Sequence, residues 1–328
     1  MDEAIEVKKP VRSIGATRKN KARSVKLVNF ETGEYVSILP KLGATVRELV
    51  LRCDDRLYSL LEFPLFYEET VENRHFAGVK LIPFPGRITN ATYRFGGKIH
   101  KLRANSSNNF AIHGFFTDKA FRLAGTTVKD RSASITLDAI HKGNVKGYPY
   151  EFSVRLTYTL KGGSFACTTE IRNIDSKPIP IGDGWHPYFK TSGSVRRLLL
   201  SLPPHSIVEV TPSKVPTGEI KRSTSKRSII PLSNKFLDSV FDFGKKRRRV
   251  TTRLIDPRLG MEIQLWQESG AGRYRYLILY RPASKTSVAI EPWTCAPDAF
   301  NNKMGLIVLR PGGKFKASYG VILKRLRS

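Results

Sequence analysis

The chain has 328 residues, 40% of them hydrophobic, and its 56 Lys and Arg residues against 28 Asp and Glu residues give a formal net charge of +28. This length and hydrophobic content allow a sizeable core and exclude an intrinsically disordered chain. No apolar run approaches the length of a membrane-spanning helix, and residues 1–8 lack the apolar centre of a signal peptide, so we expect a soluble, cytoplasmic protein without a membrane partner. The three cysteines, Cys53, Cys167 and Cys295, are odd in number and far apart, which argues against a disulfide framework and a zinc site.

The N-terminal residues differ in composition from the rest of the chain. Residues 1–24 are rich in Lys, Arg and Ser, and we expect them to form a basic arm that is partly disordered or lies on a sheet. No internal repeat and no linker divides residues 25–328, which we expect to fold as a single domain. Helical periodicity is scarce, and the best candidate for a short helix lies around residues 66–73.

Two loop strings come next along the chain. The string PFPGRI at 83–88 places Arg87 after a rigid, proline-rich turn and before a strand over 91–95. The string NFAIHGF at 109–115 sets His113 beside a glycine that lets the backbone approach a ligand closely. Each string is weak evidence alone, because a loop arginine is usually solvated and a His-Gly pair is usually a turn.

Strand patterns dominate the middle of the chain. Residues 152–160 alternate between apolar and polar side chains, residues 161–163 form a turn, and residues 165–171 return, which predicts a hairpin. Further turns are indicated at 96–97, 256–260 and 311–313. Many strands in series without alternating helices predict an all-β protein, a large β-sandwich with few short helices.

The string GWHPYF at 184–189 sets His186 among three aromatic residues. Pro187 restricts His186 to extended conformations, and an imidazole in partly apolar surroundings is a suitable proton donor near neutral pH. Taken alone, the string fits a packed structural histidine at least as well.

The string VAIEPW at 288–293 ends an apolar strand with a carboxylate. Desolvation disfavours the charged form of a buried Glu291, so its pKa should rise into the range useful for a base. The alternative is an edge-strand glutamate exposed to water. Residues 297–301 (PDAFN) form a turn in which Asp298 and Asn301 are able to hydrogen-bond the backbone.

Basic residues gather in a run at 245–249 and in looser groups at 18–23 and 221–227. No zinc-finger spacing, RNA-binding sheet signature or helix-turn-helix pattern accompanies them. We therefore expect no specific nucleic-acid partner, although nonspecific binding to polyanions at low salt needs only clustered charge. The run at 245–249 is interpreted as a solvated loop between strands.

In this order the strings resemble the aldose 1-epimerase (galactose mutarotase) family. The matching pieces are PFPGRI, the IHG string at 112–114, GWHPYF, an LDSVF string at 237–241, and IEPW at 290–293 followed by PDAFN. The resemblance implies a β-supersandwich enzyme that interconverts the α and β anomers of a free aldose, such as galactose or glucose, without a cofactor. It further implies that His186 is the general acid, that Glu291 is the general base, and that Arg87, His113 and Asp238 bind sugar oxygens.

Three positions depart from the family pattern or leave it ambiguous. Gly86 stands where many family members have Asn before the loop arginine, and Phe121 stands where a tryptophan is common. Asp242 follows Asp238 by four residues and is an alternative for the same role. The departures concern sugar preference more than the reaction.

The main rival hypothesis is a carbohydrate-binding protein that holds a sugar on the same fold without converting it. Retention of both His186 and Glu291 favours an enzyme over a binding protein. For such an enzyme, a phosphorylated sugar is the alternative to a free aldose as substrate. Trp185 or Tyr188 is a candidate to stack on the apolar face of the sugar. Neither a dinucleotide-binding nor a phosphate-binding glycine loop is present, which agrees with the absence of a cofactor. We expect a monomer or a homodimer.

Overall fold

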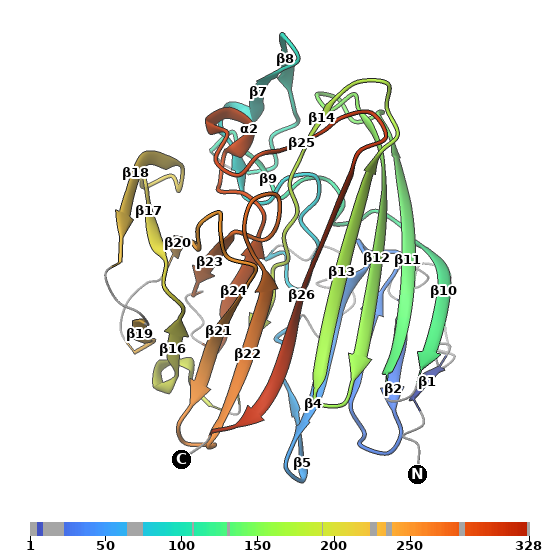
Figure 1. The fold of residues 1–328 in the computed structure, drawn as a ribbon, viewed down its shortest axis with the longest axis vertical. Helices are drawn as coiled ribbons and strands as arrows, with labels where there is room; N and C mark the ends of the chain where they lie inside the picture. Colours follow the sequence, from blue (N-terminus) through green and yellow to red (C-terminus); the bar gives the residue numbers. More distant parts are fainter. Residues whose placement is uncertain are drawn as a thin grey trace.

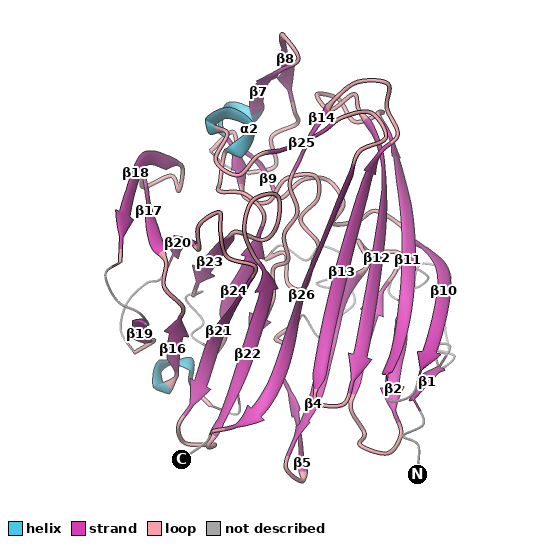
Figure 2. Cartoon of the chain, viewed as in Figure 1, coloured by secondary structure: helices cyan, strands magenta, loops and turns pink. Residues whose placement is uncertain are grey.

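Two layers of β-sheet enclose one main hydrophobic core in the computed structural model of this protein (Figure 1). The structure describes residues 5–8, 23–63, 75–106, 108–129, 132–191, 193–223, 228–233, 238–281 and 286–326. Figure 2 shows strands throughout and only short helical turns in the described residues. The prediction of a large all-β sandwich with few short helices is confirmed.

The first layer is a nine-stranded sheet that forms the broad front of the molecule in Figure 1. Its neighbouring strands are antiparallel. In spatial order they are β10 (Arg122–Lys129), β11 (Ser132–Lys142), β12 (Glu151–Lys161), β13 (Ser164–Asn173), β26 (Lys314–Arg325), β22 (Met261–Glu268), β21 (Arg249–Asp256), β16 (Leu199–Leu202) and β19 (Ser228–Pro231).

The second layer combines a six-stranded and a five-stranded sheet, linked by an isolated bridge between Leu61 and Phe189. The six-stranded sheet contains β15 (Tyr188–Phe189), β24 (Val288–Trp293), β23 (Tyr276–Tyr280), β20 (Asp238–Asp242), β17 (Ser206–Val210) and β18 (Pro216–Arg222), in that spatial order. The five-stranded sheet contains β1 (Ile5–Lys8), β2 (Val25–Asn29), β3 (Tyr35–Leu39), β4 (Thr45–Cys53) and β5 (Arg56–Ser59).

Small elements at one end complete the described fold. They are the strand pairs β6 (Arg87–Ile88) with β9 (Ala111–Ile112), β7 (Thr92–Phe95) with β8 (Lys98–Lys101) and β14 (Ile179–Ile181) with β25 (Ile307–Leu309), the one-turn helix α2 (Ala299–Asn302), and the 3₁₀ turns at Thr89–Ala91 and Val195–Arg197. Figure 1 shows β7, β8 and α2 gathered at the top of the view.

Alternation of side chains along the long strands places the core between the layers. Every second residue of β12 from Phe152 to Leu160 is buried, and those between are half-buried or exposed. This period of two is the one that a sheet with one covered face requires. The Tyr158 hydroxyl crosses the core and donates to the backbone oxygen of Ala44, which follows β3 in the opposite layer. The strand pattern of the sequence therefore fixes which face is buried.

The predicted turns lie where the sequence places them. β12 and β13 pair with Lys161 opposite Ser164, so residues 162–163 form a tight hairpin turn. The turns at 96–97, 256–260 and 311–313 lie between β7 and β8, β21 and β22, and β25 and β26 respectively. The pattern of glycine and proline therefore predicts the connections correctly.

Two other predictions concern segments that lie wholly or partly outside the described residues. The helix expected around 66–73 lies outside them. Of the N-terminal arm, β1 pairs antiparallel with β2, and the division into an arm and one domain stays a prediction. The basic run at 245–249 is exposed and lies between β20 and β21, and its last residue, Arg249, is the first of β21. This agrees with a solvated loop between strands.

Two features are absent from the described residues. No helix there is both long enough and apolar enough to cross a membrane. In the same part of the chain, no three His, Cys, Asp or Glu side chains are grouped so as to hold a metal ion.

Candidate active site

Three chain segments run side by side beneath the site: residues 78–81, residues 183–186 and the end of β24. The segment 183–186 bonds on one side to 78–81, through the amides of Leu81 and His186 to the oxygens of Gly184 and Val79 at 2.9 and 3.1 Å. On its other side, Trp185 donates its amide hydrogen to the oxygen of Pro292 at 3.3 Å. His186 therefore lies beside the end of β24, the strand that carries Glu291.

One face of the six-stranded sheet carries the site. Residues directly opposite each other on antiparallel strands share a face. Glu291 pairs with Ile278, and Ile278 pairs with Val240, so Glu291 shares its face with Val240 and, by alternation, with Asp238. The neighbouring Ile290 points the other way and belongs to the main core. The site is thus built on the sheet face turned away from that core.

The two residues predicted to do the chemistry are in contact. Nε2 of His186 lies 3.5 Å from Oε1 of Glu291. The two residues are only 6% and 1% exposed. Tyr188 stacks on the His186 ring at a centroid distance of 4.9 Å and an interplanar angle of 24°, which fixes the plane of the imidazole.

Burial shifts the pKa values of this pair in opposite directions. Desolvation lowers the pKa of His186 to about 3 and raises the pKa of Glu291 well above its usual range. The hydrogen bond from Trp293 acts in the opposite sense and lowers the pKa of Glu291. Over a wide pH range the pair therefore holds one proton, and burial favours the neutral pair with that proton on Glu291.

Arg87 is half-buried at the start of β6, and hydrogen bonds with Asp298 hold the backbone at residues 87 and 89. The backbone oxygen of Arg87 accepts from the Asp298 amide at 2.7 Å, and the Asp298 carboxylate accepts from the amide and hydroxyl of Thr89 at 3.0 and 2.9 Å. Asn301 donates to the oxygen of Thr92 at 3.0 Å. The predicted backbone hydrogen bonds of Asp298 and Asn301 are confirmed, and they brace the turn that presents Arg87.

The charge of Arg87 acts on the acidic groups of the site. Burial lowers the pKa of the Arg87 guanidinium, whereas Asp238 and Glu291 both act to raise it. A half-buried guanidinium within reach of two carboxylates is suited to hold a polar ligand by charge-assisted hydrogen bonds.

His113 lies against His186 and presents one defined nitrogen. The ring centroids of the two histidines are 5.4 Å apart. Nδ1 of His113 accepts from the Gly86 amide at 3.1 Å, so in the neutral imidazole the proton is on Nε2. Burial and the neighbouring His186 and Arg87 lower the pKa of His113 well below its usual value. This imidazole is therefore neutral and carries its proton on Nε2, where it is able to donate a hydrogen bond.

The structure distinguishes the two aspartates that the sequence leaves open. Asp242 is buried and forms a two-point ion pair with Arg275, with one bond of 2.6 Å from Nε to Oδ1 and a second from Nη2 to Oδ2. Asp238 is half-buried, pairs with Lys214 at 3.4 Å, and acts on the pKa values of Arg87 and Glu291. Asp238 therefore lies among the predicted site residues, whereas the carboxylate of Asp242 is engaged by Arg275.

Sequence reasoning assigned no role to Trp293 and Lys214, and it misplaced Trp185. Trp293 donates through Nε1 to Oε2 of Glu291 at 3.1 Å, and its place two residues after Glu291 on one strand was a usable signal. No pattern in the sequence points to Lys214. Trp185 is fully buried and stacks on Tyr319 in the core at 5.0 Å, so of the two residues expected to stack on sugar, Trp185 is excluded and Tyr188 remains the candidate.

A buried ion pair lies on the core side of the His186 segment. Nζ of Lys80 is 2.8 Å from Oδ2 of Asp183, and both side chains are fully buried. The Tyr274 hydroxyl donates to the same carboxylate oxygen at 2.5 Å. The Asp183 amide and the Thr294 side chain are also hydrogen-bonded, at 2.9 Å. The ion pair and these hydrogen bonds connect the segment that carries His186 with the segment that carries Glu291.

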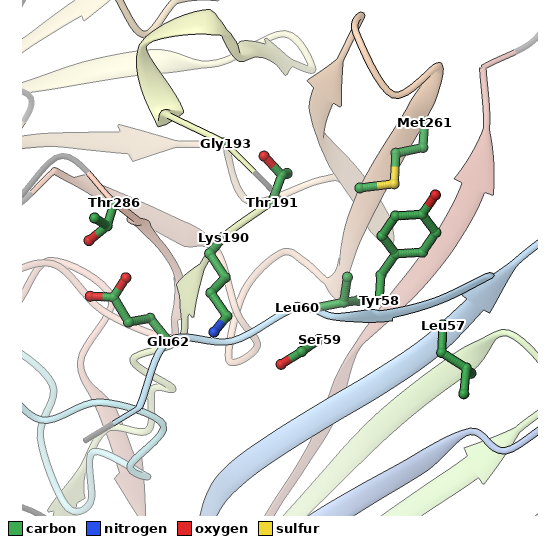
Figure 3. A pocket seen from close by; sticks show the side chains of 10 residues that line it. All are labelled: Leu57, Tyr58, Ser59, Leu60, Glu62, Lys190, Thr191, Gly193, Met261 and Thr286. Atoms are coloured by element: carbon green, nitrogen blue, oxygen red, sulfur yellow. The ribbon is translucent and has the colours of Figure 1, made fainter. Parts of the chain in front are cut away.

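A hollow of about 610 Å³ lies elsewhere in the structure (Figure 3). Its lining includes Tyr58, Glu62, Lys190 and Met261 and none of the five predicted site residues. The strand pairing that links residues 60–62 to 188–190 connects it to the site. It is therefore a separate surface feature.

Comparison with known proteins gives a consistent result. A family model described as aldose 1-epimerase matches residues 26–321. The uncharacterized protein YihR of Escherichia coli is 25% identical over 312 residues, which cover 91% of this chain and 93% of that protein. The galactose mutarotase of Sus scrofa is 25% identical over 157 residues, which cover 47% of this chain and 44% of that protein.

Solved structures share the fold. A galactose mutarotase-like protein from Clostridium acetobutylicum matches with a TM-score of 0.81 at 19% identity, over 99% of both chains. The GalM/aldose epimerase homologue from C. elegans matches with a TM-score of 0.79 at 20% identity, over 93% of this chain and 99% of that one.

Proposed function

The chain belongs to the aldose 1-epimerase family, and from this membership and the buried His186–Glu291 contact we propose that it interconverts the α and β anomers of a free aldose such as galactose or glucose. The observation that carries the proposal is the 3.5 Å separation of His186 Nε2 and Glu291 Oε1. The anomeric hydroxyl and the ring oxygen of an aldose are bonded to the same carbon, so an acid and a base that act on them must lie close together.

Ring opening transfers two protons. Ionised Glu291 removes the proton of the C1 hydroxyl, protonated His186 delivers a proton to the ring oxygen, and the C1–O5 bond breaks. The products are the open-chain aldehyde, a protonated Glu291 and a neutral His186, so the number of protons is unchanged. Acid and base groups placed in this way each contribute roughly 10²–10⁴-fold to the rate.

Inversion needs no further chemical group. Rotation about the C1–C2 bond turns the other face of the aldehyde toward the C5 hydroxyl. Ring closure then reverses both proton transfers and restores the ion pair. Burial of both residues favours the neutral pair over the ion pair. The ion pair that starts ring opening is therefore the less populated form, and the two proton transfers convert it into the form that the site prefers.

The remaining site residues position the sugar. Arg87 donates charge-assisted hydrogen bonds to hydroxyl oxygens, and His113 donates one through Nε2. Asp238 accepts from a hydroxyl. No cofactor takes part in these steps. Cytoplasmic location and a monomeric or homodimeric state are carried forward as predictions.

Anomer exchange measured by NMR across a panel of aldoses tests the proposal. We expect the purified protein to accelerate α–β exchange of at least one free aldose in proportion to its concentration. A panel that includes 6-phosphorylated aldoses separates a free from a phosphorylated substrate. If the protein binds an aldose without accelerating its exchange, it is a carbohydrate-binding protein and the proposal fails.

A further inference from the structure

Trp293 lies in a slot formed by two glycines. A Cβ atom placed on Gly86 would lie 2.7 Å from Cζ3 of Trp293, and one placed on Gly184 would lie 2.7 Å from Cδ1. Both distances are too short for carbon atoms in contact, so the indole occupies the space that any other side chain at these positions would need. The two contacts meet opposite ends of the indole, one on each ring. Its plane is therefore fixed from two sides.

The ring of His113 forms a third side of the slot around Trp293. The His113 ring meets the indole edge to face at a centroid distance of 5.8 Å, and Trp293 itself is only 3% exposed. Gly86 comes from the PFPGRI string and Gly184 from the GWHPYF string, so three distant parts of the chain shape one pocket for one side chain. A side chain enclosed in this way has little freedom to change rotamer.

The single N–H group of the Trp293 indole donates a hydrogen bond to the carboxylate of Glu291. Nε1 of Trp293 donates to Oε2 of Glu291 at 3.1 Å, while Oε1 faces Nε2 of His186 at 3.5 Å. An indole nitrogen is only a donor, and a carboxylate oxygen is its natural acceptor. The two oxygens of Glu291 thus have different partners, and only Oε1 faces the acid.

We propose that Trp293 is a positioning residue for the general base: it holds Oε2 of Glu291 so that Oε1 points at His186 and at the anomeric hydroxyl. This inference rests on the proposed function. A hydrogen bond to an ionised group is stronger than one to a neutral group, so the contact also favours the carboxylate over the acid. It offsets part of the cost of burying that charge.

The effect on pH dependence has a definite sign. Loss of the donor makes the last proton of the His186–Glu291 pair harder to remove, so the alkaline limb of the rate profile moves to higher pH. The groups that interact with the Glu291 carboxylate are the same in wild type and variant: His186, Arg87, Tyr188, Asp238 and Tyr280. His113, which lies against His186 and Trp293, is also unchanged.

Trp293→Phe keeps a ring in the slot and removes the N–H. We expect kcat to fall about tenfold with little change in KM, and the alkaline limb of kcat to move up by about one pH unit. Trp185→Phe is the matched control, because its indole is equally buried and donates to the backbone oxygen of Gly78 at 3.2 Å. That variant loses stability but leaves the position of the limb unchanged.

The outcomes are distinct. A wild type without exchange activity defeats the proposed function. An active wild type whose Trp293→Phe variant retains the wild-type limb overturns the inference, because a structural role would alter stability or rate without moving the limb.

A measurement on the wild type keeps the inference testable if the variant does not fold. In ¹H–¹⁵N spectra, the Trp293 indole signal, assigned with Trp185→Phe and Trp266→Phe, should shift with pH along the alkaline limb. Glu291→Gln should abolish that titration. A Trp293 signal that stays constant through the limb in wild type would overturn the inference.

Discussion

Nε2 of His186 lies 3.5 Å from Oε1 of Glu291, and both side chains are almost completely withdrawn from water. The pair takes up a second proton only near the His186 pKa of about 3 and loses its last one above the raised pKa of Glu291. The reaction needs one proton on the pair. We therefore expect kcat/KM to be flat through the neutral range, to fall toward pH 3, and to fall again on the alkaline side. A limb centred near pH 6.5 would show a normally titrating imidazole and contradict the assignment.

Arg87→Ala should weaken sugar binding more than it slows the chemistry. Its guanidinium is assigned to positioning, so we expect KM to rise about tenfold or more, the size expected for a lost charge-assisted hydrogen bond, while kcat changes less. Steady-state kinetics by polarimetry measures both. Arg94→Ala, an exposed arginine on β7, is the control and should leave KM unchanged. A tenfold fall in kcat at constant KM would show instead that Arg87 stabilises the transition state.

The two aspartates of β20 should behave differently when changed to Asn. Asp238→Asn should raise KM with little loss of stability, because this side chain is half-buried and faces the site. Asp242→Asn should leave Arg275 without its ionised partner and cost about 3–5 kcal/mol of unfolding free energy. Kinetics and urea denaturation of both variants separate the two effects. The assignment fails if Asp242→Asn raises KM and Asp238→Asn does not.

Lys80→Met should be strongly destabilising, because it leaves the fully buried Asp183 carboxylate without its cation. The expected loss is about 3–5 kcal/mol in urea denaturation. The double change Lys80→Met with Asp183→Leu removes both charges and should recover much of that loss. If the double variant is no more stable than the single one, the ion pair is not the source of the effect.

Strand alternation and motif strings predict much of this molecule from sequence. The alternating pattern of 152–160 gives β12 and its buried face, and the strings around His186 and Glu291 give the pair that meets in the fold. The same alternation would have placed Trp185 on the face opposite His186, and so in the core. The expectation that Trp185 or Tyr188 stacks on sugar takes the string as a wall of aromatic residues and not as a strand, and the burial of Trp185 excludes it for that residue.

Other features depend on contacts between distant segments. The choice between Asp238 and Asp242 depends on Arg275, and nothing near either aspartate in the sequence identifies that partner. Gly86 and Gly184 stand in separate strings, and only the fold shows that both make room for Trp293. Pairings of this kind are set by tertiary packing, which local patterns do not encode.

Anomer exchange in Glu291→Gln tests the central claim most directly. Gln keeps the shape of the side chain and can still accept from Trp293, but it cannot remove a proton, so we expect the exchange rate to fall roughly 10²–10⁴-fold with modest change in sugar affinity. His186→Asn should act similarly, and Glu219→Gln, on the exposed strand β18, should exchange at the wild-type rate. Exchange at the wild-type rate in both Glu291→Gln and His186→Asn would show that this pair is not the acid and base.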